Sequence, residues 1–270
     1  MTKSDSGQTK EEKVKADESQ SSGSSATDFN YKDFELTISE MLKRGVHFGH
    51  RKSRWNPKMR PYIFGVRNNV HIIDLGKTVS LFEKALEFIR SIVFNNGKIL
   101  FIGTKPQAKK LIAEAAKETD MPYVNNRWLG GTFTNFKEIS GRIKYLNDQE
   151  RKEKAGEFKK YTKYEQIKIK KEIDKMNEKM GGIKKMDKLP QAIFAVDVIG
   201  DKLAVKEARQ VKIPVIALTD TNTDPTLADY PIPANDDAIS SLEFMLGIVV
   251  KNIKGVGSQA ERDKRASSKM

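Results

Sequence analysis

Cysteine is absent from this chain of 270 residues, and long apolar runs are absent as well. Without cysteine there can be no disulfide bonds and no thiolate ligands for zinc. The most apolar C-terminal run, Leu242 to Val250, is interrupted by Glu243 and is far shorter than the roughly 20 residues that a membrane-spanning helix needs. The N-terminus is polar and lacks the apolar segment of a signal peptide. We therefore expect a soluble protein that stays in the cytoplasm and does not bind membranes.

Acidic residues are missing from one long stretch, residues 43–67, which we call the basic strip. It reads KRGVHFGHRKSRWNPKMRPYIFGVR and holds eight Lys and Arg residues, in a chain whose net charge is +13. Aromatic rings are interleaved with these cations at His47, Phe48, His50, Trp55 and Tyr62. Cationic groups suit phosphates and planar rings suit bases, so the pattern predicts an RNA-binding segment. The alternative is a solvated basic loop whose aromatic side chains pack locally.

Composition divides the chain into four parts. Residues 1–33 are rich in Ser, Gly, Lys and Glu and are predicted to be a disordered N-terminal extension. Residues 34–136 and 189–253 are predicted to form one α/β sheet domain. Residues 137–188 are predicted to be an inserted helical hairpin, and residues 254–270 a basic, disordered tail.

Apolar runs of strand length alternate with amphipathic segments in the predicted sheet domain. The runs at 98–102, 192–196 and 213–218 have the continuous apolar character of strands buried on both faces, and shorter strands are expected at 122–124 and 230–232. Helices are expected at 34–44, 77–95, 202–211 and after Asn235, which we expect as an N-cap. This alternation predicts a doubly wound parallel sheet of the Rossmann or flavodoxin-like type.

Local signals refine two connections. Asn68 and Asn69 separate two apolar runs and predict a hairpin turn, because asparagine tolerates left-handed backbone. Thr104 and Gln107 have the spacing of a capping box, with Pro106 in the first turn of the helix that follows.

The predicted insert consists of two charged, helix-favouring segments, residues 135–155 and 160–180, with a break near Gly156. A narrow apolar stripe is expected on each, through Ile139, Ile143 and Leu146 on the first and Tyr164, Ile167, Met176 and Met180 on the second. Two such helices can pair as an antiparallel coiled coil. Residues 137–188 hold 17 basic and 10 acidic residues, so RNA is the favoured partner; the alternatives are an arm that docks protein and a hairpin exposed to solvent.

Three features could suggest an enzyme, and each has a simpler explanation. Gly103-Thr104-Lys105 follows a predicted strand and could bind phosphate, but it lacks the spacing of a P-loop or a dinucleotide motif. The run from Asp220 to Pro225 could hold a hard cation, although its residues also form turns. His47 and His50 lie three residues apart without an apparent third ligand. We therefore predict no catalytic residue, no cofactor and no metal, with a nucleotide-binding α/β enzyme as the alternative.

Several motifs closely resemble one bacterial family in the same order along the chain. They are GVHFGHRKSRWNPKMRPYIFGVRNNVHIIDL (Gly45 to Leu75), VNNRWLGGTFTNF (Val124 to Phe136), LPQAIFAVD (Leu189 to Asp197), EARQVKIPVIALTDTNTDP (Glu207 to Pro225) and IPANDDAI (Ile232 to Ile239). Together they resemble the family of ribosomal protein S2, over about residues 36–252. The chain departs from it at both ends, and also at 198–201, where many relatives carry histidine; no metal site is carried over there.

The resemblance implies a structural constituent of the small ribosomal subunit. Its expected partners are small-subunit ribosomal RNA, ribosomal protein S1 and neighbouring small-subunit proteins, and no homo-oligomer is expected. The family's basic-aromatic segment corresponds to His47 to Arg60, and its RWLGG motif to Arg127 to Gly131; Trp128 is expected to pack rather than to face RNA. The predicted RNA-binding residues are Arg44, His47, His50, Arg51, Lys52, Arg54, Trp55, Asn56, Lys58, Arg60, Arg127, Lys144, Lys159, Lys160, Lys163, Lys168 and Lys171.

Overall fold

A sheet of five parallel strands lies at the centre of the structure, a computed structural model that describes the backbone of residues 34–267 and side chains as far as residue 256. The strands lie in the order β5-β4-β6-β7-β8. Their bounds are β4 Ile99–Ile102, β5 Tyr123–Val124, β6 Ala192–Ala195, β7 Val215–Thr219 and β8 Tyr230–Pro233. Every neighbouring pair is parallel. Counted along the chain, the order is 2-1-3-4-5, that of flavodoxin-like sheets, so the predicted parallel α/β class is confirmed.

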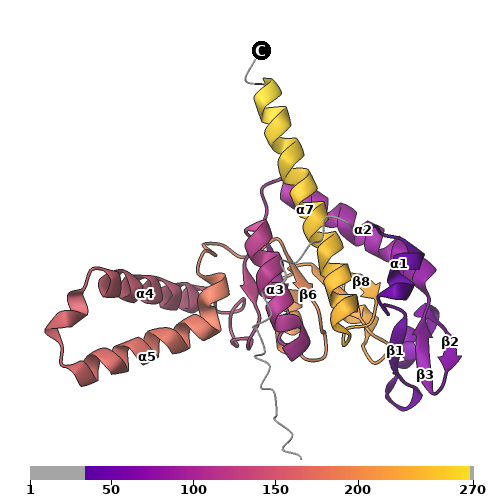
Figure 1. The fold of residues 1–270 in the computed structure, drawn as a ribbon, viewed down its shortest axis with the longest axis horizontal. Coiled ribbons are helices and arrows are strands. Elements are labelled where there is room, and N and C mark those ends of the chain that lie inside the picture. The colour runs from indigo at the N-terminus through magenta and orange to yellow at the C-terminus, as the bar shows by residue number, and fades with distance from the viewer. Residues whose placement is uncertain (1–33, 268–270) are drawn as a thin grey trace, which may run out of the picture.

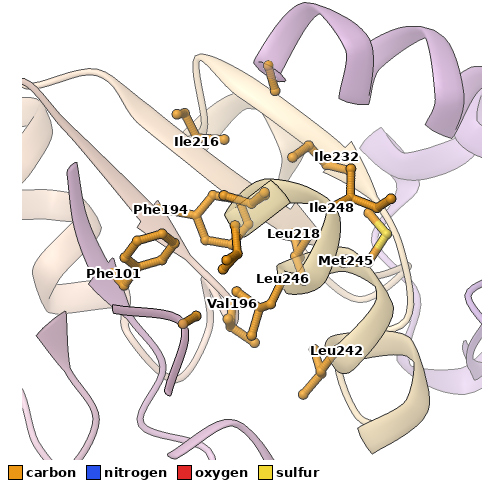
Figure 2. Close-up of a cluster of buried hydrophobic side chains, with 14 of the residues drawn as sticks. Phe101, Phe194, Val196, Ile216, Leu218, Ile232, Leu242, Met245, Leu246 and Ile248 are labelled. Carbon is orange, nitrogen blue, oxygen red and sulfur yellow. The ribbon is translucent and has the colours of Figure 1, made fainter. Parts of the chain in front are cut away.

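Helices cover both faces of this sheet (Figure 1). On one face lie α2 (Leu75–Phe94), α3 (Pro106–Thr119) and α7 (Ile239–Ser267), and on the other lies α6 (Lys202–Gln210). Every residue of β4, β6 and β7 is buried, because successive side chains of a strand point to opposite faces and both are covered. Figure 2 shows Phe194 and Leu218 of the sheet beside Leu246 of α7.

A smaller antiparallel sheet carries the basic strip. It contains β1 (Phe48–Arg51), β3 (Val70–Ile73) and β2 (Ile63–Arg67), in that order, and helix α1 (Ile38–Lys43) precedes it. Two short 3-10 segments, Lys52–Arg54 and Pro57–Tyr62, connect β1 to β2. Asn68 and Asn69 have φ of 50° and 61°, so the predicted left-handed turn between β2 and β3 is confirmed.

Helices α4 (Phe136–Lys154) and α5 (Lys163–Met180) lie side by side and project from the sheet domain (Figure 1). Ile139, Ile143 and Leu146 of α4 are buried, as predicted. On α5 the predicted stripe is wrong in its first half, because Tyr164 and Ile167 are exposed while Ile173 and Met180 are buried. At about 100° per residue Tyr164 lies on the opposite side of the helix from Ile173, so one stripe cannot contain both.

The described ends of the chain differ from the predicted boundaries. Helix α7 continues to Ser267, past residue 254, where the sequence predicted a disordered tail; helix-favouring Lys, Arg, Glu, Gln and Ala residues dominate this part. The helix begins at Ile239, so the prediction of Asn235 as its N-cap is wrong. Asn235 Oδ1 instead accepts hydrogen bonds from the backbone N–H groups of Asp237 and Ala238 in the preceding turn. The extension predicted over residues 1–33 lies outside the described residues.

No helix within the described part of the chain is both long enough and apolar enough to cross a membrane.

Candidate nucleic-acid interface

The basic strip presents most of its cations to solvent. Arg51, Lys52, Arg54, Lys58 and Arg60 are all exposed. Of these, Lys58 forms an ion pair, with Asp224 at 2.6 Å, and the other four have no carboxylate within 4 Å among the described residues. An uncompensated cationic surface of this kind attracts polyanions.

Backbone contacts hold the strip against the loop that follows β7. The N–H of His50 donates to Thr221 Oγ1 at 2.8 Å, and the N–H of Asn56 donates to the carbonyl of Thr221 at 2.8 Å. The approach is close at Gly49, where a Cβ atom would lie 2.5 Å from Cγ2 of Thr221. Larger residues at position 49 would therefore push β1 away from this loop.

Three aromatic residues of the strip are partly buried. The ring of His47 lies tilted against that of Phe48, with centroids 4.0 Å apart, and burial lowers the pKa of His47. Trp55 is half-buried beside His71, with ring centroids 5.2 Å apart. His50 faces the interior: its Nδ1 lies 3.1 Å from Asp220 and its Nε2 lies 3.3 Å from Asp237. The hydrogen bond to Asp220 raises the pKa of His50, against the opposing effect of burial.

His50 belongs to a charged cluster at the carboxyl ends of the central strands, where flavodoxin-like folds bind their ligands. At its centre the Lys105 ammonium lies 2.7 Å from Asp236, 2.8 Å from Asp237 and 3.4 Å from Asp197. Burial lowers the pKa of Lys105, but these carboxylates outweigh it and raise the pKa above its ordinary value. The helix start that could have bound phosphate through its backbone therefore carries a lysine that three carboxylates of its own chain hold.

Thr104 also has a different partner from the predicted one. Its Oγ1 donates to Asp201 at 2.9 Å, and α3 has Lys105 as its N-cap without a side-chain cap. The predicted capping box is wrong because the helix begins one residue later than a cap at Thr104 requires, and because the N–H of Thr104, which Gln107 would accept in such a box, points to Asp201 instead. Burial raises the pKa of Asp201 to about 6, despite these hydrogen bonds.

One group of side chains in this cluster could hold a cation. His50, Asp220 and Asp236 each place a ligand atom within 4.8 Å of the other two. Burial and the neighbouring Asp220 raise the pKa of Asp236. Lys105 already supplies positive charge beside these carboxylates, and His50 adds to it when protonated, so the arrangement is also explained as an internal ion-pair network.

The loop that carries the RWLGG motif is organised by Glu207 of α6. Its carboxylate accepts hydrogen bonds from Trp128 Nε1 at 3.1 Å, the N–H of Gly131 at 2.8 Å and the N–H of Phe133 at 3.0 Å. Trp128 is 7% exposed, so the expectation that it packs is confirmed. Arg127 is exposed on the same loop.

The lysines predicted on the insert are also exposed and unpaired. None of them has a carboxylate within 4 Å among the described residues, whereas Arg151 and Lys152 on α4 both pair with Asp148. These lysines are Lys144, Lys159, Lys160, Lys163, Lys168 and Lys171. Figure 1 places α4 and α5 at the opposite end of the molecule from β1, β2 and β3, so the predicted RNA-binding residues of the strip and of the insert form two separate surfaces, and Arg127 belongs to neither segment.

The sequence interpretation missed two features. The ion-pair network around Lys105 joins residues more than 90 positions apart, and clustered carboxylates after successive strands were the one available signal. Tyr161 and Tyr164, which are 42% and 78% exposed, were not among the predicted RNA-binding residues.

Comparison with known proteins identifies the relatives of the chain. The family model "Ribosomal protein S2" matches residues 41–255. The small ribosomal subunit protein uS2 of Roseiflexus sp. (strain RS-1) is 51% identical over 210 residues, which cover 78% of this chain and 80% of the relative. The protein of the same description from Roseiflexus castenholzii (strain DSM 13941 / HLO8) is 52% identical over the same shares of both chains.

Proposed function

This chain belongs to the ribosomal protein S2 family, and on that premise we propose that it binds small-subunit ribosomal RNA through two basic surfaces. Members of this family are structural, non-enzymatic components of the small ribosomal subunit and take part in translation. The first surface is the basic strip, and the second is the lysine-rich exterior of α4 and α5, acting as an inserted coiled-coil hairpin. The site of action is the ribosome, in the cytoplasm.

The observation that supports this proposal best is the absence of counter-charge around the strip. Arg51 and Arg54 are exposed and have no carboxylate within 4 Å among the described residues, although the chain uses carboxylates to pair buried Lys105 and partly exposed Lys184. Exposed cations that are left unpaired keep their full attraction for phosphate groups. Their backbone is held by the contacts to Thr221, so the cations are presented from an ordered segment.

The test replaces Arg51 and Arg54 with Gln and measures binding to small-subunit ribosomal RNA at several salt concentrations. Each lost phosphate contact should reduce the slope of log K against log salt by about 0.7–0.9, so the double variant should lose about 1.5. The matched control replaces Lys202 and Lys206 with Gln, since both are exposed on α6. Equal slopes for the two double variants, or unchanged incorporation into small subunits, would contradict the proposal.

We also propose that the protein helps to dock ribosomal protein S1, as the family resemblance implies, and that it does so without forming a homo-oligomer. Small subunits depleted of this chain should then retain less ribosomal protein S1 after sedimentation. Normal retention would show that docking does not depend on this chain.

The rival function, a nucleotide-binding enzyme, has little support in the geometry. The position at which such a fold would bind phosphate is filled by Lys105 and its three carboxylates, whose negative charge repels phosphate groups. Equilibrium dialysis with labelled nucleotides separates the two functions, because specific micromolar binding would favour the enzyme.

A further inference from the structure

The far end of the insert, residues 156–164, is an ordered turn, which we call the tip. Gly156 has φ of 74° and begins a 3-10 segment, Glu157–Lys160. Thr162 then caps α5 in a capping box with Glu165, whose carboxylate accepts the N–H of Thr162 at 3.0 Å. Gln166 Nε2 donates to the carbonyl of Tyr161 at 2.9 Å. The side chains that the tip presents are therefore carried on a defined backbone.

Aromatic rings are exposed at the tip although the packing of α4 and α5 does not need them there. Tyr164 is 78% exposed and Tyr161 is 42% exposed, while α5 contacts α4 through a different row that includes Ile173. Lys160 Nζ lies 5.5 Å from the centroid of the Tyr161 ring, which places a cation against one aromatic face. Phe158 lies beside the same ring at 6.3 Å.

Unpaired cations lie close to these rings along the chain. Lys160 and Lys163 flank Tyr161 and Tyr164 in the sequence, and Lys168 follows Tyr164 by one helical turn on the same side of α5. None of the three has a carboxylate within 4 Å in the part of the chain that the structure describes. The charge of Glu165 is taken up by the capping box at the positive end of the α5 dipole. The tip therefore combines exposed aromatic faces with positive charge that the described residues leave unpaired.

We propose that the tip is a stacking platform for an unpaired nucleotide of ribosomal RNA, with its base on Tyr164 and its flanking phosphates against Lys160, Lys163 and Lys168. This inference rests on the proposed RNA-binding function and extends it to a specific chemistry. Lysines alone would hold a duplex as well as a single strand. A planar ring, in contrast, requires a base that is free of its pairing partner. Charge complementarity favours RNA over an apolar protein segment, since unpaired lysines accompany the exposed rings.

The experiment measures binding of a short single-stranded RNA that carries one 2-aminopurine base, whose fluorescence falls when it stacks. It uses the full chain with Arg51 and Arg54 replaced by Gln, so that the basic strip contributes less to binding. In this background Tyr164→Ala should weaken binding on the order of tenfold and abolish the quenching, with little change in the salt slope. Tyr164→Phe should restore both, whereas Tyr164→Leu should not, because leucine is apolar but not planar.

Tyr145 provides the matched control. It is 48% exposed on α4, and Asp148 lies one turn further along that helix, so Tyr145→Ala should leave binding unchanged. The stacking inference is overturned if Tyr164→Ala retains the quenching, if Tyr164→Leu binds like Tyr164→Phe, or if a duplex of the same sequence binds as tightly as the single strand. These failures would leave the function proposed above intact, because that function is tested separately by Arg51 and Arg54 on the whole ribosomal RNA.

Discussion

At the scale of single residues, Glu207 shows how one buried carboxylate can fix a loop. Burial alone would raise the pKa of Glu207, but N–H groups of Gly131, Phe133 and Thr134 and the indole of Trp128 lower it below its ordinary value. A carboxylate whose pKa is lower in the folded state stabilises the fold above its unfolded pKa of about 4.3. That stabilisation is lost as the pH falls through the folded-state pKa.

Glu207→Gln should therefore destabilise the protein by about 2 kcal/mol at pH 7. The amide has one oxygen where the carboxylate has two, and its NH2 group would face N–H groups that now donate hydrogen bonds to the carboxylate. The difference from the wild type should shrink when the pH falls below the folded-state pKa, because the wild-type carboxylate is then protonated. Urea unfolding at both pH values measures this, with exposed Glu172→Gln as the control. A constant difference at both pH values would mean that packing, and not charge, explains the effect.

At the scale of elements, helix α5 of the insert shows that residue type alone does not predict which side chains are buried. Ile167 and Ile173 are the same residue type on the same helix, and they are 55% and 4% exposed. Ile173→Ala should cost about 2–4 kcal/mol in the stability of α4 and α5, whereas Ile167→Ala should change it by less than about 0.5 kcal/mol. Hydrogen exchange of the α4 and α5 amides would measure both. A larger effect at Ile167 would show that the two helices pack through the other face.

Sequence patterns predicted some elements correctly and others wrongly, and the difference depends on whether the signal is local. The strands of the central sheet and the turn at Asn68 and Asn69 were predicted correctly, because continuous apolar runs and left-handed asparagines are local signals. The predictions of a stripe through Tyr164 and of a cap at Thr104 were wrong, because both depend on contacts with other elements. The buried face of α5 depends on α4, and the hydrogen bond of Thr104 depends on Asp201. The position of the basic strip was visible in the sequence, but the inward direction of His50 depends on Asp220, 170 residues later.

At the scale of the whole molecule, exposed positive charge and clustered negative charge lie in different parts of the protein. The strip and the insert lie at opposite ends and carry exposed cations (Figure 1), whereas the cluster at the carboxyl ends of the central strands pairs Lys105 with carboxylates. Residues 189–250, which supply all three of those carboxylates, hold 9 acidic and 4 basic residues. The exposed positive charge that attracts a polyanion is therefore concentrated at the two ends of the protein.

This separation predicts that the two surfaces act independently. Lys168 and Lys171 of α5 lie far from Arg51 and Arg54 and share no partner with them among the described residues, so their effects on binding should add within about 0.5 kcal/mol. Replacing either pair with Gln should reduce the salt slope of binding to small-subunit ribosomal RNA by about 1.5, and replacing both by about 3. If the fourfold variant binds like the Arg51 and Arg54 variant alone, the lysines of the insert do not contact phosphate. The insert would then be an arm that docks protein, and cross-links from α5 should reach neighbouring proteins of the small subunit instead of RNA.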